Sequence, residues 1–365
     1  MIDCCWHDLY EKQCSDPHFL FPWYDDEYKR VMDVVRCNTV QVLLLSGLTL
    51  TGLFKLSYLV SSSLLCEKGT GSSYPCGVCV GCRWVMADTH PDLRCLLSRS
   101  SLLEFLPPSV NIGRTDSGDS DKSLSGISVD RVRDLSNFFS LSTHRGLRVV
   151  FIAPVESLTE SASQALLKTL EEPLSKTIFV LMSYAPHLLK ETLLSRCQVH
   201  FRVSAPRANF VESWLLKISS SSMSLLPPPI VPFIIHRPFY ALIIIATGTY
   251  TILGKIHSLL FIRPFNFWET ISSCKELIRA WSKFLTSHQA IMVLLDIIIV
   301  ILRSHISYYW SAESENLSLH EKSGGLLAWL GFFDQMQESY RMLCSALPNY
   351  ELLLEHVMGY HPFLS

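Results

Sequence analysis

Residues 147–183 read LRVVFIAPVESLTESASQALLKTLEEPLSKTIFVLMS and hold two short apolar runs on either side of a more polar segment. The runs 147–153 and 178–183 are nearly continuous in apolar residues, which is typical of strands buried on both faces. The segment between them has the apolar spacing of a helix. A strand, a helix and a second strand in this order form the repeating unit of a parallel α/β sheet.

Boundary signals frame the helix between these two strands. Ser157 and Glu160 have the spacing of a capping box, in which each side chain satisfies a backbone N–H at a helix start. Pro173 cannot continue a helix and marks its end. The sequence therefore predicts a helix over 157–172.

The same two patterns continue in both directions along the chain. Strands are expected over 41–46, 93–97 and 198–203, and helices over 27–35, 53–65, 129–140 and 187–194. Loops rich in Ser and Pro are expected over 98–126 and 219–229. Together these elements predict a parallel α/β sheet covered by helices on both faces.

The character of the chain changes after Pro206, beyond which no further strand is predicted. Two apolar stripes at helical spacing lie near the C-terminus: Phe333, Met336, Tyr340, Leu343 and Leu347, and then Leu353, Leu354, Val357 and Met358. Such stripes are typical of helices in a bundle, so the C-terminal part is expected to be all-α.

The composition is that of a globular protein without a dominant charge. Of 365 residues, 48% are hydrophobic and 18% are charged, against about 25% charged in an average protein. Lys and Arg number 31 and Asp and Glu number 33, so the formal net charge is −2. These values exclude an intrinsically disordered chain and a protein that holds nucleic acid through a general basic field.

No membrane partner is expected. The most apolar stretches, 241–253 and 290–302, are shorter than the about 18–20 apolar residues of a membrane span, so we expect buried helices. The N-terminal residues MIDCCWHD have no signal-peptide pattern. Without such a signal, closely spaced cysteines indicate metal binding rather than disulfides, and a cytoplasmic location.

Four of the twelve cysteines form the cluster Cys66-x9-Cys76-x2-Cys79-x2-Cys82. Four thiolates satisfy tetrahedral zinc and leave no open position, so the spacing predicts a structural zinc site. Gly77 and Gly81 are expected to allow tight turns around the metal. His90, in the segment THPD, is a further candidate ligand, but we expect a loop histidine that does not bind the metal.

Residues 47–54, GLTLTGLF, lie between a predicted strand and a predicted helix, where a phosphate-binding loop G-x-x-x-x-G-K-[ST] belongs. Gly47 and Gly52 have the right spacing, but Leu53 takes the lysine position and Phe54 the hydroxyl position. Lys55 is two positions late and projects from another face of the helix. We expect a turn that binds no ATP, with a weak anion site at the helix N-terminus as the alternative.

Two further positions bear on ATP hydrolysis. An ATPase places carboxylates after the strand at 147–153, but only Glu156 follows it, and we expect it to begin the next helix. Arg196, in Ser195-Arg196-Cys197, is on its own typical of a surface ion pair. In an oligomeric ATPase, an arginine at a subunit edge can reach the γ-phosphate of a neighbour.

Together these motifs resemble the bacterial DNA polymerase III clamp-loader family of AAA+ proteins. The resemblance is carried by LLKTLEEP at 166–173 and SRCQ at 195–198, with the zinc cysteines between the first helix and the next strand. It is supported by FPW at 21–23, THPD at 89–92, GISVDRVR at 126–133 and NYELLLE at 349–355. The degenerate phosphate loop is most similar to that of a non-hydrolysing stator subunit of this family.

The resemblance implies a division of the chain into an N-terminal extension and three domains. It implies an extension over 1–20, an AAA+-like α/β domain over 21–204 with the zinc module at 66–82, a helical lid at 205–255 and a helical collar at 256–365. The collar of this family joins the subunits into an open ring.

The resemblance also implies a role in DNA replication. The chain would join the motor (gamma/tau) and delta subunits in a hetero-oligomeric ring that loads the sliding clamp on primed DNA. Arg196 would act in trans as an arginine finger, with Ser195 and Cys197 positioning it. No ATP and no catalysis are expected from this chain alone, although the assembly is part of a DNA-directed DNA polymerase, a nucleotidyltransferase.

Three alternatives stay open: an ATP-binding motor subunit of the same loader, a zinc-module DNA-binding protein, and a diverged copy without function. Leu53 and Phe54 argue against the motor subunit, and the balanced charge argues against the DNA-binding protein.

Overall fold

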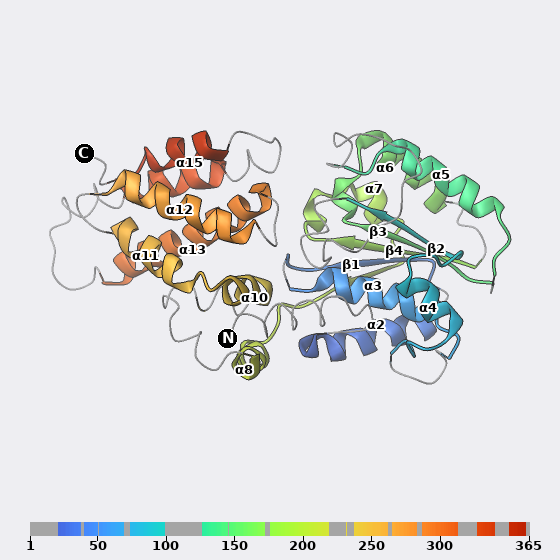
Figure 1. The fold of residues 1–365 in the computed structure, drawn as a ribbon. Coiled ribbons are helices and arrows are strands. Elements are labelled where there is room, and N and C mark those ends of the chain that lie inside the picture. The colour runs from blue at the N-terminus through green and yellow to red at the C-terminus, as the bar shows by residue number, and fades with distance from the viewer. Residues whose placement is uncertain are drawn as a thin grey trace. The chain divides into compact units, whose positions relative to one another are not determined.

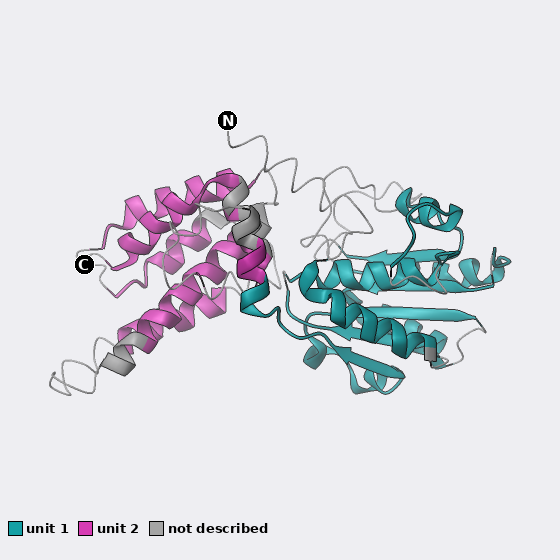
Figure 2. Cartoon of the chain, turned by 90° about the horizontal axis from the view of Figure 1, so that it is seen from below, with its two compact units in different colours: residues 1–210 teal, residues 211–365 magenta. Residues whose placement is uncertain are grey.

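The computed structural model describes residues 21–37, 40–49, 51–68, 74–98, 126–144, 146–171, 176–218, 231, 237–261, 265–282, 287–312, 327–339 and 350–362. The chain forms two compact units, residues 1–210 and 211–365 (Figure 2). Several predictions lie outside the described residues: the extension 1–20, residues 99–125 of the first loop, the loop 219–229, the helix stop at Pro173, and the stripe from Tyr340 to Leu347.

Unit 1 is built on a five-stranded parallel sheet, as predicted (Figure 1). Its strands are β1 (Val42–Ser46), β2 (Leu93–Leu97), β3 (Arg148–Ala153), β4 (Thr177–Ser183) and β5 (Val199–Arg202). The order across the sheet is β2-β3-β4-β1-β5, and every pair of neighbours is parallel. β1 therefore lies between β4 and β5, and the carboxyl ends of all strands face one edge.

The burial of each strand follows its place in the sheet. All residues of β1 and β3 are buried, and β4 is buried except at Ile178. The outer strands β2 and β5 carry half-buried and exposed residues, including the charged Arg94 and Arg202. This difference explains why the central strands read as continuous apolar runs, whereas a charged edge protects the sheet from pairing with other chains.

Helices cover both faces of the sheet. The helices of unit 1 are α2 (Asp25–Cys37), α3 (Leu53–Leu64), α4 (Val80–Met86), α5 (Val129–Ser140), α6 (Glu160–Glu171) and α7 (Glu191–Leu194). Figure 1 shows α2, α3 and α4 on one side of the sheet and α5, α6 and α7 on the other. On the second side, Phe138 of α5 and Leu166 of α6 share one apolar core with Val150 and Phe179 of the strands.

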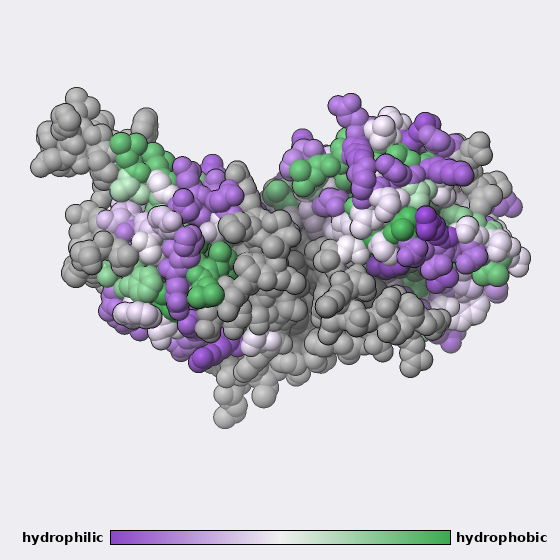
Figure 3. All heavy atoms as spheres, turned by 90° about the horizontal axis from the view of Figure 1, so that it is seen from above, coloured by the Kyte–Doolittle hydropathy of each residue, from purple (hydrophilic) through white to green (hydrophobic). Residues whose placement is uncertain are grey.

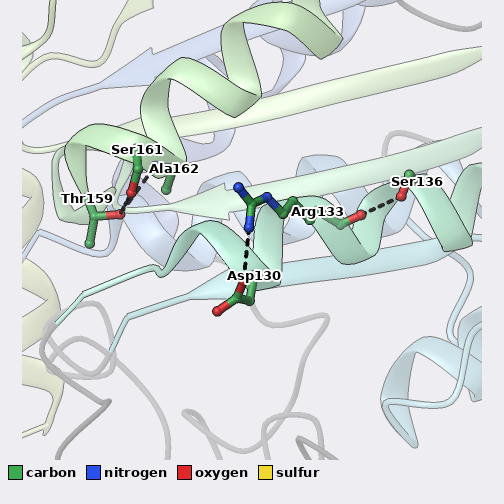
Figure 4. A network of polar contacts seen from close by, with 6 residues as sticks. All are labelled: Asp130, Arg133, Ser136, Thr159, Ser161 and Ala162. Atoms are coloured by element: carbon green, nitrogen blue, oxygen red, sulfur yellow. Dashed lines mark hydrogen bonds and ion pairs between the residues drawn. The ribbon is translucent and has the colours of Figure 1, made fainter.

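The start of α6 corrects the predicted capping box. Ser157 lies in a short 3-10 helix, η4 (Val155–Ser157), and Glu160 is the first residue of α6. The cap is Thr159, whose Oγ1 accepts a hydrogen bond from the backbone N–H of Ala162 at 3.2 Å (Figure 4). The predicted box fails because Glu160 is ion-paired with Lys190, and Ser157 Oγ accepts from Ser98.

The helix predicted over 187–194 is two short elements. These are the 3-10 helix η5 (Pro186–Leu188) and α7. Leu189 and Lys190 between them have extended backbone angles, which interrupt the helical hydrogen bonds. The break keeps Leu193 in the core while Leu188 stays exposed.

The regular elements among the described residues of unit 2 are all helices, as predicted. Its helices are α8 (Ala208–Ile218, which begins in unit 1), α10 (Pro238–Thr247), α11 (Tyr250–Phe261), α12 (Phe267–Trp281), α13 (Ser287–Ala312), a helix over 327–339 and α15 (Tyr350–Met358). α12 packs against α10, α11, α13 and α15. Trp281 is fully buried there, and its Nε1 donates to Thr249 Oγ1 at 3.0 Å.

The two predicted C-terminal stripes differ in how well they match the buried faces. Leu353, Leu354, Val357 and Met358 are all buried in α15, as predicted. In the helix over 327–339, the buried apolar residues are Trp329, Phe332 and Met336, whereas Phe333 is only half-buried. The buried stripe therefore includes Phe332 rather than Phe333.

The apolar stretch 290–302 belongs to the longer helix α13. Within the described residues, one window is long and apolar enough to cross a membrane, namely Ala290–Ser307. The window extends the predicted stretch by residues 303–307, of which only Ile306 is apolar, and it holds two charged residues, Asp296 and Arg303. Half of the window is buried inside the protein, so it is a weak indication of a membrane span.

Asp296 is the polar exception on the apolar face of α13. Its Oδ2 accepts hydrogen bonds from Arg237 Nη1 at 2.8 Å and from the Tyr240 hydroxyl at 2.7 Å. Burial raises the pKa of this carboxyl, and the charge of Arg237 opposes that rise. A carboxylate buried in an apolar helix is tolerated because these two partners satisfy it.

Removing Asp296 should therefore destabilise unit 2. Asp296→Ala removes the ion pair with Arg237 and the acceptor of the Tyr240 hydroxyl, and we expect a loss of about 2–3 kcal/mol in the free energy of unfolding, measured by urea denaturation. The control is Lys255→Ala, which removes an exposed ion pair with Glu269 and should cost less than about 1 kcal/mol. Equal losses for the two variants would contradict a stabilising role of the buried pair.

Candidate functional site

The four cysteines of the predicted metal site lie together. All four Sγ atoms are within 4.8 Å of one another. Cys66 Sγ is 4.0 Å from Cys79 Sγ, and Cys76 Sγ is 3.9 Å from Cys82 Sγ. Tetrahedral metal–sulfur bonds of ~2.3 Å place the sulfurs ~3.8 Å apart. The cluster therefore has the dimensions of a closed, four-sulfur metal site.

Backbone N–H groups point at these sulfurs. The amides of Cys76, Cys79 and Cys82 donate to the Sγ atoms of Cys66, Cys76 and Cys79, at 3.3, 3.4 and 3.3 Å. A hydrogen bond from the Val78 amide lowers the pKa of Cys76 to about 6. Burial raises the pKa of Cys66 and Cys82. A bound cation would supply the charge that stabilises all four thiolates together.

The two glycines of the cluster meet different requirements. Gly77 has a φ of +69°, the left-handed conformation that glycine adopts without strain. Gly81 lies inside α4, where a Cβ atom would be 2.6 Å from the Leu65 carbonyl oxygen. The prediction of a tight turn is therefore right for Gly77, whereas Gly81 permits a close approach of α4 to the chain before Cys66.

Tyr74, in the segment between Cys66 and Cys76, connects the cysteine cluster to helices α2 and α3. The Tyr74 hydroxyl donates to Asp25 Oδ1 of α2 at 2.6 Å, and its ring stacks on Tyr28 at 4.8 Å. Tyr28 in turn hydrogen-bonds Ser63 Oγ of α3 at 2.6 Å. Sequence reasoning missed Tyr74, and its signal was an aromatic residue two positions before a ligand cysteine.

His90 has a structural environment beside the cluster. It is buried, its Nδ1 accepts from the backbone N–H of Asp92 at 3.0 Å, and its ring packs edge-on against Trp84. The four-sulfur group does not include it. His90 thus shapes the turn before β2.

The residues that follow the loop between β1 and α3 are buried in the protein core. Gly52 takes a φ of +96° at the start of α3. Leu53 is fully buried, and Phe54 packs on Phe151 of β3 with ring centroids 5.5 Å apart. Lys55 is buried as well, at 5% exposed. The residues at the lysine and hydroxyl positions of a phosphate loop therefore belong to the core.

Trp23 secures the same loop from the N-terminal side. Its Nε1 donates to the Thr51 carbonyl at 3.0 Å, and Thr51 Oγ1 donates to the Leu48 carbonyl at 2.8 Å. Both bonds use backbone oxygens, so residue types alone did not reveal them.

Glu156 has a different role from the one predicted. It lies in η4 rather than in the following helix. Its Oε1 accepts hydrogen bonds from the backbone amides of Tyr184 at 2.8 Å and Ala185 at 3.2 Å. The carboxylate therefore holds the segment that leaves the end of β4.

Arg196 lies in a hydrogen-bonded turn between α7 and β5. The backbone amides of Arg196 and Cys197 donate to the carbonyls of Leu193 and Leu194, each at 3.1 Å. The Arg196 side chain is 46% exposed, and its Nη2 donates to Glu171 Oε1 at 2.9 Å. The pairing with Glu171, the last residue of α6, was not predicted.

The residues on either side of Arg196 form side-chain hydrogen bonds to the backbone of α7. Ser195 Oγ donates to the Thr192 carbonyl at 2.9 Å, and Cys197 Sγ donates to the Leu193 carbonyl at 3.3 Å. Burial raises the pKa of Cys197 to about 11, so its thiol is protonated at neutral pH and is a poor nucleophile.

Comparison with known proteins gives a match over most of unit 1. The family model described as "DNA polymerase III, delta subunit" matches residues 29–204. The DNA polymerase III subunit delta' of Buchnera aphidicola (subsp. Baizongia pistaciae) is 31% identical over 54% of this chain and 54% of its own length. That of Escherichia coli is 30% identical over 53% and 52%. About half of this chain is homologous to the delta' subunit of DNA polymerase III.

The chain spans about half the length of the curated delta prime relatives it matches. Among solved structures, a DNA polymerase III gamma subunit-related protein from Thermotoga maritima covers 92% of this chain and 99% of its own, with 16% identity and a TM-score of 0.43. That likeness is too loose to carry an argument. The homology therefore concerns the sheet, the cysteine cluster and the Arg196 turn.

The cysteine cluster should bind one metal ion per chain. Cys76→Ser removes one of the four sulfurs, so we expect the metal content of the purified protein to fall from about one equivalent to near zero, measured by elemental analysis. Cys95→Ala, which removes a cysteine outside the cluster, should keep the full content. Unchanged metal content in the Cys76→Ser protein would contradict the assignment.

Proposed function

We propose that this chain is the non-hydrolysing stator subunit of a DNA polymerase III clamp loader. Two features support the proposal: the homology of about half of this chain to delta prime subunits, and the interior packing of Leu53 and Phe54. The packing of Leu53 and Phe54 is the observation that distinguishes a stator from a motor subunit within the loader family. A motor subunit needs a lysine for the β- and γ-phosphates and a hydroxyl for Mg²⁺ at these two positions.

In this proposal, residues 21–204 form an AAA+-like domain with a structural zinc ion. The parallel sheet with helices on both faces and the degenerate loop after β1 support the domain assignment. Zinc is the metal that best suits four cysteine sulfurs in a closed tetrahedral site. Cys66, Cys76, Cys79 and Cys82 would hold it, and the ion would stabilise the fold of the loop 66–82.

The proposal places the chain in a hetero-oligomeric ring with motor (gamma/tau) and delta subunits. Residues 205–255 would serve as the lid and 256–365 as the collar that joins the ring. The sliding clamp and primed DNA would be handled by the assembly in the cytoplasm. No ATP binding is assigned to this chain.

Arg196 is the residue through which the chain would act on its neighbour. Its backbone is held in a hydrogen-bonded turn, and its side chain is half exposed. A guanidinium presented at a subunit edge can stabilise the negative charge that develops as the γ-phosphoryl group leaves. Ser195 and Cys197 would position it through their hydrogen bonds to α7.

A zinc-module DNA-binding protein is the competing function. It would need a basic, exposed face, whereas the formal net charge is −2. The balanced charge favours the loader subunit over an independent DNA-binding protein. In the coloured parts of Figure 3, hydrophilic and hydrophobic residues are interspersed.

Replacing Arg196 tests the proposed function. In a ring reconstituted with motor and delta subunits, Arg196→Ala should leave assembly intact but lower clamp- and primed-DNA-stimulated ATPase at the adjacent site by a factor on the order of 10³. The matched control is Arg133→Ala, which removes an exposed, ion-paired arginine of α5 and should leave the rate unchanged. Normal ATPase in an assembled Arg196→Ala ring would refute the role in trans.

A further inference from the structure

The segment that leads from β4 to Arg196 is held by three carboxylates that come from η4 and α6. Glu156 accepts the amides of Tyr184 and Ala185 at its start. Glu160, the first residue of α6, is ion-paired with Lys190 in the middle. Glu171, the last residue of α6, is ion-paired with Arg196 at the end. The segment is therefore attached along the whole length of α6, about 18 Å.

The position of Glu171 is unfavourable for the helix that carries it. The C-terminus of a helix has partial negative charge, so a carboxylate there is disfavoured, and a basic residue is favoured. Glu160 and Lys168 obey this rule at the two ends of α6, whereas Glu171 does not. The stability of α6 therefore does not explain why residue 171 is a glutamate. The ion pair between Glu171 and Arg196 does explain it.

The backbone around Arg196 is fixed independently of Glu171. Leu193 is buried in the core, and the Gln198 amide donates to the Val42 carbonyl of β1 at 3.1 Å. The Gln198 side chain also accepts from the Gln41 amide at 2.6 Å. What remains free in this turn is the long arginine side chain, and Glu171 is the group that restrains it.

We propose that Glu171 is the positioning residue of Arg196: it holds the guanidinium in a pre-ordered orientation for the neighbouring subunit's nucleotide. This inference rests on the proposed function of Arg196. The ion pair uses Nη2, and a guanidinium has five N–H donors in a planar fork, so donors remain for an anionic phosphate. Restraining a flexible side chain before the reaction reduces the entropy lost in the transition state.

The positioning role of Glu171 is tested by the ATPase rate of the neighbouring motor subunit in the reconstituted ring. Glu171→Ala should lower kcat about fivefold with KM for ATP unchanged, because an exposed ion pair supplies a restraint of that size. Glu171→Gln, which keeps a hydrogen-bond acceptor, should recover part of the loss. The matched control is Asp130→Asn, which removes the charge of an exposed, ion-paired carboxylate of α5 outside this segment and should leave kcat unchanged.

A double variant separates positioning from a structural effect. If Glu171 acts only through Arg196, Glu171→Ala has no further effect in an Arg196→Ala ring. Additive losses, an unchanged kcat in Glu171→Ala, or a raised kcat, which would mean that Glu171 withholds the arginine, would each overturn the proposal. The Arg196→Ala ring separates failure of this inference from failure of the proposed function. If that ring keeps full ATPase activity, the proposed role of Arg196 itself is wrong.

Discussion

Burial of the three central strands β3, β4 and β1 is the constraint on which unit 1 depends. Their side chains are almost completely removed from water, so helices must cover both faces and the loops must gather at the two edges of the sheet. The edge at the carboxyl ends carries the loop before α3, Glu156 and the start of the segment that leads to Arg196. The same edge is where ligands bind in open α/β sheets.

The side chains at this edge of the sheet account for both parts of the proposed function, namely the lack of ATP binding and the action of Arg196 on a neighbouring subunit. Where a phosphate loop would present charged and polar groups, Leu53 and Phe54 extend the core toward Phe151. At the other end of α6, Arg196 stays half exposed and is restrained by Glu171. The chain thus has a closed loop after β1 and a half-exposed arginine, which the proposal assigns to the nucleotide site of a neighbouring subunit.

The sequence predicted the features that depend on residue type and spacing. Continuous apolar runs located the central strands β1, β3 and β4, and shorter apolar patterns located the outer strands β2 and β5. The cysteine spacing located four sulfurs that do come together. The cap at Thr159 was missed because Glu160 pairs with Lys190, thirty residues away in the chain. Contacts of Glu156 with backbone amides, and of Tyr74 with Asp25, depend on tertiary folding and leave no local pattern. Spacing alone likewise placed Phe333 rather than Phe332 on the buried face.

The most direct test of the central claim is the affinity of the isolated, full-length chain for nucleotide. Fluorescent ATP with Mg²⁺ would be titrated with the protein, and a motor subunit of the same loader would serve as the positive control. We predict no saturable binding, because the cation and hydroxyl positions are occupied by Leu53 and Phe54 in the core. Saturable binding comparable to that of the motor subunit would contradict the assignment as a non-hydrolysing stator.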